Sequence, residues 1–200
     1  MIKLYDLCLK YDKNTVIDKL SYEFEEGKVT AILGDSGVGK TSLLNVCAGL
    51  QKASDGKVVC DAQRLSYIFQ EPRLFPWLSA LENVSTVSDE KTAIEMLTLM
   101  GLEDAMAKYP SELSGGMKQR VSIARALAYD PDVILMDEPF ASLDPQRRES
   151  VCNILFERIK GKTALLVTHN VEDTVYADAV LRLTPAPSSK LVDYFESGKK

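Results

Sequence analysis

A glycine-rich string in the first quarter of the chain has the residue types needed to hold a row of phosphates. Residues 34–41 match the pattern G-x-x-x-x-G-K-[ST], in which glycines let the backbone curl so that successive N–H groups point at phosphate oxygens. Lys40 is expected to reach the β- and γ-phosphates, and Thr41 to offer its hydroxyl to Mg²⁺. A strand before the string and a helix after it favour this interpretation over a chance glycine-rich turn. The predicted nucleotide contacts here are Gly34, Asp35, Ser36, Gly37, Val38, Gly39, Lys40, Thr41 and Ser42.

Two adjacent carboxylates close an apolar run at residues 133–136. Buried parallel strands are continuously apolar, and their carboxyl ends face the ligand crevice. Asp137 is therefore expected to hold Mg²⁺, through water, and Glu138 to orient or deprotonate an attacking water. An acidic pair after a strand also occurs in ordinary helix-capping turns. Beside a phosphate-binding loop, the catalytic interpretation is favoured.

A second glycine-mediated helix start lies at residues 113–120, which read Leu-Ser-Gly-Gly-Met-Lys-Gln-Arg. Ser114 supplies a hydroxyl and a helix cap, and Gly115 and Gly116 allow the backbone to approach an anion closely. A simple cap accounts for the serine and one glycine but not for the whole string. The only histidine, His169, follows another apolar run, a position where a structural role is common.

The elements that position these residues can be read from periodicity. Alternating or β-branched runs predict strands at residues 3–11, 16–24, 28–33, 58–60, 65–69, 133–136 and 163–168. Helical spacing predicts helices at residues 41–50, between 79 and about 109, at 117–129, at 145–160 and from about 171. The alternation of strands and helices predicts an α/β fold with a mainly parallel sheet and an antiparallel β region near the N-terminus. We expect one domain over residues 1–200, with a core at 1–78 and 129–200 and an inserted helical subdomain at about 79–128.

Composition limits the classes of partner and compartment. The 24 Lys and Arg and 29 Asp and Glu residues give a net charge of −5, which argues against a nucleic-acid partner. No apolar run approaches the roughly 18 residues that cross a bilayer, and the N-terminus lacks the apolar core of a signal peptide. We expect a cytoplasmic protein whose membrane role needs a separate partner. The four cysteines lie far apart in the sequence, which predicts that they are small buried side chains of a protein in a reducing compartment. They are Cys8, Cys47, Cys60 and Cys152.

With the string at 113–120, the chain resembles the ATP-binding cassette of ABC transporters over nearly its full length. The resemblance gives Gln70 the role of a metal and water ligand and of a sensor for the membrane partner. It places Asp144, in Ser142-Leu143-Asp144, at the loop that meets the partner cassette, and makes His169 the switch histidine at the γ-phosphate. Tyr11 lies where the family carries an aromatic that stacks on adenine, although an ordinary strand aromatic would also suit that position.

The resemblance also implies the cofactors, the partners and the cycle. ATP and Mg²⁺ are the expected cofactors, with Thr41, Gln70 and Asp137 around the metal. Two copies of the chain close head to tail, so that ATP lies between Lys40 of one copy and Ser114, Gly115 and Gly116 of the other. Binding of ATP drives closure, and hydrolysis permits opening. Permease subunits convert that cycle into transport, at the cytoplasmic face of the inner membrane.

Residues 71–84 resemble the nitrate, sulfonate and taurine importer group, which includes cassettes for thiamine-precursor pyrimidines. Leu74, Phe75, Pro76 and Trp77 are expected to line a groove for a coupling helix of the permease; the alternative is that they pack the core of the inserted subdomain. An external solute-binding protein is then an indirect partner. Only 42 residues separate Gln70 from Leu113, fewer than this group leads us to expect, with the loss around residues 85–91.

Two other kinds of ABC protein remain open. An exporter cassette working with separate membrane chains would carry the same motifs. ABC ATPases of DNA repair and chromosome organisation need a long insertion between the phosphate loop and residue 113, yet Thr41 and Leu113 are only 72 positions apart. Translation factors of the family usually carry two cassettes, and this chain shows one. The sequence therefore favours an importer.

Overall fold

The chain folds around two β-sheets of different kinds. The computed structural model describes residues 1–12 and 14–194. The smaller sheet is antiparallel, with the order β2-β1-β4. Its strands are β1 (Ile2–Tyr11), β2 (Asn14–Phe24) and β4 (Asp55–Cys60).

The larger sheet has the order β5-β6-β7-β3-β8-β9, and every neighbouring pair is parallel except β8 and β9. Its strands are β3 (Val29–Leu33), β5 (Leu65–Ile68), β6 (Val133–Asp137), β7 (Thr163–Val167), β8 (Ala179–Leu183) and β9 (Leu191–Asp193). All residues of β3, β6 and β7 are buried, as continuous apolar runs predict. The predicted α/β class, with a mainly parallel sheet and an antiparallel N-terminal region, is confirmed.

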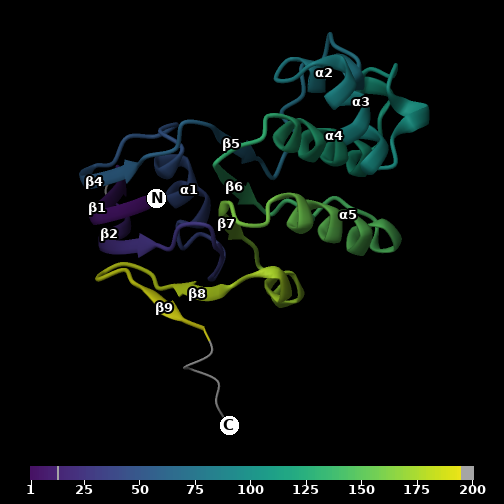
Figure 1. Cartoon of the computed structure of the whole chain (residues 1–200). Coiled ribbons are helices and arrows are strands. Elements are labelled where there is room, and N and C mark those ends of the chain that lie inside the picture. The colour runs from purple at the N-terminus through teal and green to yellow at the C-terminus, as the bar shows by residue number, and fades with distance from the viewer. Residues whose placement is uncertain (13, 195–200) are drawn as a thin grey trace.

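Helices cover the larger sheet on both faces. They are α1 (Lys40–Cys47), α2 (Ala80–Ser85), α3 (Glu90–Leu99), α4 (Gly115–Ala128) and α5 (Pro145–Arg158), with three 3₁₀ helices, η1 (Glu103–Ala105), η2 (Pro110–Glu112) and η3 (Val171–Tyr176). Figure 1 shows α2, α3 and α4 grouped at the end of the molecule away from the three-stranded sheet. These three helices lie within the predicted insertion at 79–128; its bounds as a subdomain stay a prediction. No helix among residues 1–12 and 14–194 is long and apolar enough to cross a bilayer.

Strand β6 shows how the sheet separates two hydrophobic cores. Val133 and Leu135 face a core that contains α1 and the three-stranded sheet, whereas Ile134 and Met136 face a core that contains α4 and α5. The alternation follows from the period of two along a strand. Helix α1 therefore packs between the two sheets, and the phosphate-loop residue Lys40 begins it.

Several element bounds differ from the sequence predictions. Helix α1 ends at Cys47 rather than residue 50, because Gly49 takes a left-handed φ of 70° and ends the helix. Strand β4 begins three residues earlier than predicted, at Asp55, where it pairs with Cys8 of β1. The prediction contained neither β8 nor β9, because short apolar runs near turns carry little periodicity. Three cysteines are buried, but Cys60, at the end of β4, is only partly so.

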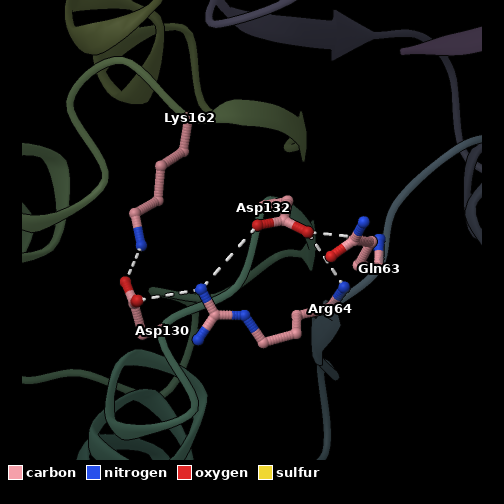
Figure 2. Close-up of polar contacts among 5 residues, drawn as sticks. All are labelled: Gln63, Arg64, Asp130, Asp132 and Lys162. Carbon is pink, nitrogen blue, oxygen red and sulfur yellow. Dashed lines mark hydrogen bonds and ion pairs between the residues drawn. The ribbon is translucent and has the colours of Figure 1, made fainter.

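An ion-pair network joins the starts of three adjacent parallel strands (Figure 2). Arg64, Asp132 and Lys162 immediately precede β5, β6 and β7. One Asp132 oxygen accepts hydrogen bonds from the backbone N–H groups of Gln63 at 3.1 Å and Arg64 at 3.0 Å. The Arg64 guanidinium lies 3.0 Å from Asp130, which also pairs with Lys162. We call these five residues the amino-edge network.

Candidate functional site

The phosphate loop runs from the end of β3 into α1, and its shape requires glycine at two points. Gly39 has a φ of 107°, and a Cβ there would lie 2.7 Å from Val16 Cγ1. A Cβ at Gly34 would lie 2.9 Å from Val38 Cγ1 and 3.1 Å from the Leu183 carbonyl. Contacts below 3 Å force neighbouring atoms to move, so side chains at these positions would distort the loop. The loop is thus packed against β2 and β8 rather than free.

Lys40 is the cation of this loop. Its residue is only 8% exposed, and its Nζ donates to the carbonyls of Gly34 at 2.7 Å and Asp35 at 3.0 Å. These carbonyls satisfy hydrogen bonds of the ammonium but carry no net charge to balance it. A buried ammonium in that setting favours an anionic ligand such as a phosphate.

Asp137 and Thr41 form an oxygen-rich pair beside the loop. Asp137 is 3% exposed, and burial raises the pKa of its carboxyl, while a hydrogen bond with the Thr41 side chain acts in the opposite direction. Lys40 also lowers this pKa, and Glu138 raises it. A carboxylate and a hydroxyl are the hard oxygen ligands that Mg²⁺ prefers. The donor set therefore fits Mg²⁺, and the buried carboxylate is one that a cation would stabilise.

Glu138 is held with its backbone in a strained conformation. Its φ is 46°, which is rare for a side chain of this length, and its N–H donates to the Val167 carbonyl at 2.8 Å. Its carboxylate, 19% exposed, lies 3.0 Å from Nδ1 of His169, whose side chain is 69% exposed. Strained residues of this kind cluster at functional sites. Glu138 directly follows the carboxyl end of β6, where ligands bind in open parallel sheets.

One cavity of about 520 Å³ gathers most of the predicted site residues. It is lined by Tyr11, Val16, Ser36, Gly37, Gly39, Lys40, Thr41, Ser42, Gln70, Glu138, Val167 and His169. An adjoining cavity of about 430 Å³ shares Thr41 and Gln70 with it and adds Asp137. The fold therefore brings residues from five separate chain segments to one edge of the sheet.

The other predicted residues are placed differently. The Val38 side chain is buried in the core with α1, so only its backbone is available to a ligand. The Asp35 carboxylate lies 3.4 Å from Arg182. Ser114 caps α4 by accepting from Met117 N–H at 3.2 Å, and Asp144 caps α5 by accepting from Arg147 N–H at 3.0 Å.

Ser114, Gly115 and Gly116 do not line the described part of the 520 Å³ cavity. Ser114 and Gly115 are exposed, and a Cβ on Gly115 would meet no described atom within 4 Å. Gly116 instead lies against the loop before α5, where an added Cβ would be 3.0 Å from the Ser142 carbonyl. The start of α4 is therefore open on one side and set away from the phosphate loop of its own chain.

Three residues near the site were missed by the sequence analysis. Asp173 of η3 accepts from Arg148 of α5 at 2.6 Å and from the Thr168 hydroxyl at 2.7 Å. With Glu138 and His169 they line a cavity of about 280 Å³. These bonds fix the segment that carries His169 relative to α5. Arg148 and Asp173 lie 25 positions apart on different elements, so no local sequence pattern indicates the pairing.

Comparison with known proteins decides the family. A family model described as "ABC transporter" matches residues 17–141. This chain belongs to the ABC transporter family. It is an ATP-binding cassette, the ATPase component of that family, as the resemblance predicted.

Similar proteins are known by sequence and by structure. The chain is 39% identical to the aliphatic sulfonates import ATP-binding protein SsuB of Bacillus subtilis (strain 168), over 90% of this chain and 78% of the relative. It is 37% identical to the taurine import ATP-binding protein TauB of Roseobacter denitrificans, over 88% of this chain and 73% of the relative. A dimeric post-hydrolysis structure of the ATP-binding cassette MJ0796, bound to ADP and Pi, matches with a TM-score of 0.83 and 30% identity, over 91% of this chain and 94% of that one. The predicted likeness to sulfonate and taurine importers is confirmed.

Proposed function

We propose that this chain hydrolyses ATP to drive import of a small sulfonate, taurine or similar solute through a separate permease. The observation that carries the proposal is the single cavity in which Lys40, Thr41 and Glu138 meet. Lys40 binds the β- and γ-phosphates, and Glu138 accepts a proton from the water that attacks the γ-phosphorus, releasing ADP. His169, 3.0 Å from Glu138, orients that water and the γ-phosphate. Mg²⁺, held by Thr41, Gln70 and Asp137, would neutralise phosphate charge.

A second copy of the chain completes the site in this proposal. The exposed start of α4, with Ser114, Gly115 and Gly116, offers backbone N–H groups and the positive end of the helix to an anion. Because it is set away from its own phosphate loop, we infer that it binds the γ-phosphate held by the partner copy. Asp144 then lies at the interface between the two copies. Tyr11, which lines the cavity, stacks on adenine in this proposal.

The permease docks, in this proposal, at the aromatic loop before α2. Trp77 is 69% exposed and Phe75 40%, with their ring centres 5.6 Å apart. The buried Asn83 side chain accepts from the Phe75 N–H at 2.8 Å and donates to the carbonyls of Phe75 and Leu78. A fixed loop that presents exposed aromatics is suited to binding a partner. Such docking would hold the chain at the cytoplasmic face of the membrane, while an external solute-binding protein delivers solute to the permease from the opposite side.

Replacing Trp77 tests the docking. Trp77→Ala should leave the melting temperature of the isolated subunit unchanged, because the ring is mostly exposed. Its affinity for the permease should fall by a factor that corresponds to about 2 kcal/mol, as for a central interface aromatic. Tyr5→Ala is the matched control, because Tyr5 is 49% exposed on β1, in the other sheet. If the melting temperature of Trp77→Ala falls sharply while permease binding per folded molecule is unchanged, Trp77 is a core residue.

A further inference from the structure

Tyr11 is held in place by two side chains of another part of the molecule. It ends β1, is 46% exposed and lines the 520 Å³ cavity. Its hydroxyl donates to Oε1 of Gln51 at 2.8 Å and lies 3.0 Å from the Ser42 hydroxyl. A tyrosine has one hydroxyl hydrogen, which goes to Gln51, so Ser42 must donate to the Tyr11 oxygen. The result is a directed chain of hydrogen bonds from Ser42 through Tyr11 to Gln51.

Gln51 is itself fixed to the helix that carries the phosphate-binding lysine. Gln51 follows the end of α1, and its backbone N–H donates at 3.2 Å to the carbonyl of Asn45, which lies within that helix. Lys40 begins the same helix, and Ser42 lies in its first turn. Tyr11, in contrast, belongs to the three-stranded sheet, which shares no strand with the sheet that bears the phosphate loop. The two bonds to Tyr11 therefore tie the aromatic ring of one sheet to the phosphate-binding helix of the other.

We propose that Gln51 is a positioning residue for recognition of the nucleotide base. By accepting the Tyr11 hydroxyl hydrogen, Gln51 fixes the ring at a set distance from the phosphate loop and leaves its face open to the cavity. An untethered tyrosine would lose side-chain freedom when a base stacks on it, and the tether removes part of that cost beforehand. This inference rests on the proposed function, because it takes the cavity to be the ATP site and Tyr11 to be its base platform.

If Gln51 positions Tyr11, replacing Gln51 should lower the affinity for a ligand that carries a base, but not the affinity for a ligand made of phosphates alone. ATP and inorganic tripolyphosphate both meet the phosphate loop, but only ATP meets Tyr11. Loss of one such hydrogen bond should weaken ATP binding about twofold to tenfold in Gln51→Ala and leave the affinity for tripolyphosphate unchanged. Tyr11→Phe removes the bonds to both Gln51 and Ser42, so its fall should be at least as large. The double variant should bind ATP as Tyr11→Phe does, because Gln51 then has no bond to Tyr11 left to lose. Gln51→Glu keeps an acceptor and should bind ATP nearly as the parent chain does.

Isothermal titration calorimetry in excess EDTA, where turnover is suppressed, measures both ligands on the whole chain. Gln63→Ala is the matched control, because Gln63 bonds Asp132 through its backbone N–H. Equal losses for ATP and tripolyphosphate in Gln51→Ala, or unchanged ATP binding in that variant, would overturn the positioning role. If the parent chain itself binds neither ligand, the proposed function fails as well. Parent binding with no effect of the variants overturns the inference alone.

Discussion

The two ends of the parallel sheet use charged residues in opposite ways, and β6 joins them. The strand starts directly after Asp132, in the amino-edge network, and ends at Asp137, in the proposed nucleotide site. The Asp132 side chain is 45% exposed, accepts two backbone hydrogen bonds and forms an ion pair with Arg64 at 3.9 Å. Asp137 is almost fully buried, and its neighbours include the carboxylate of Glu138. At the amino end of the sheet the charged side chains are paired and partly exposed to solvent. At the carboxyl end neighbouring carboxylates lie close together and are largely buried.

The pKa directions of the carboxyls show the same contrast. The hydrogen bond from Lys162 lowers the pKa of Asp130, so folding favours its charged form. Burial raises the pKa of Asp137, so folding disfavours its charged form. The amino edge thus stabilises the fold, while the carboxyl edge holds charges that a bound cation and phosphates would stabilise. Sites built for chemistry commonly lower the stability of the free protein in this way.

The largest expected difference between the two ends is in their lysines. Lys40→Ala should weaken ATP binding about 100-fold or more, because the buried phosphate charge loses its partner. Lys162→Ala removes a lysine from the amino-edge network and should leave ATP affinity unchanged. Its cost in stability should stay below about 1 kcal/mol, since Asp130 is mostly exposed and solvent screens the pair. Calorimetric titration and thermal melts on both variants check this. If the two variants bind ATP with comparable affinities, Lys40 and Lys162 do not have the different roles proposed for them.

The next difference concerns the two aspartates that flank β6. Asp137→Asn should lower ATPase activity about 10- to 100-fold, as loss of a group that holds the metal through water does. It should also keep or raise the melting temperature, because a buried charge is removed. Asp132→Asn should keep ATPase activity and cost roughly 1 kcal/mol, or about 2–4 °C in melting temperature. A lower melting temperature in Asp137→Asn than in Asp132→Asn would contradict the assignment of roles.

The smallest effect is the pH dependence of the amino edge. Asp130 has a lowered pKa in the folded chain, so it contributes stability above its ordinary value of 3.8, and this stability is lost as the pH falls through the lowered pKa. Lys162→Ala removes the largest cause of that lowering. The gap in melting temperature between the parent chain and Lys162→Ala should therefore be largest near pH 6 and narrow below about pH 4. Melts from pH 3 to pH 6 measure it, and a gap that widens on acidification would refute the pairing.

The sequence predicted the phosphate loop and the acidic pair because both depend on local order. Gly39 and Lys40 lie next to each other where the helix begins, and Glu138 lies two positions after the end of a continuous apolar run. The cavity could also be anticipated, since parallel strands place their carboxyl ends at one edge. The α/β class followed from the alternation of strands and helices, and the family resemblance from the string at residues 113–120 together with these motifs.

Contacts between distant segments could not be predicted. The bond of Gln51 to Tyr11 crosses 40 positions, and that of Arg64 to Asp130 crosses 66, with no spacing rule to announce either. The strain at Glu138 depends on its backbone bond to Val167 of β7, which no local pattern reveals. Strand β8 was missed although it is as long as β3, β6 and β7, because the exposed Arg182 interrupts its apolar run, and β9 has only three residues.

In the proposed function, one chain supplies half of each nucleotide site and a second copy completes it. Glu138→Gln tests it most directly, because it keeps the shape of the site while removing the base, which should slow hydrolysis about 10²- to 10⁴-fold. Sedimentation of this variant with Mg²⁺ and ATP should show a dimer that returns to monomer when nucleotide is removed. Adding Ser114→Arg, which blocks the open start of α4, should abolish the dimer but leave binding of ATP to the monomer. A Glu138→Gln chain that binds ATP and remains a monomer at every concentration would show that the site is not shared between two copies.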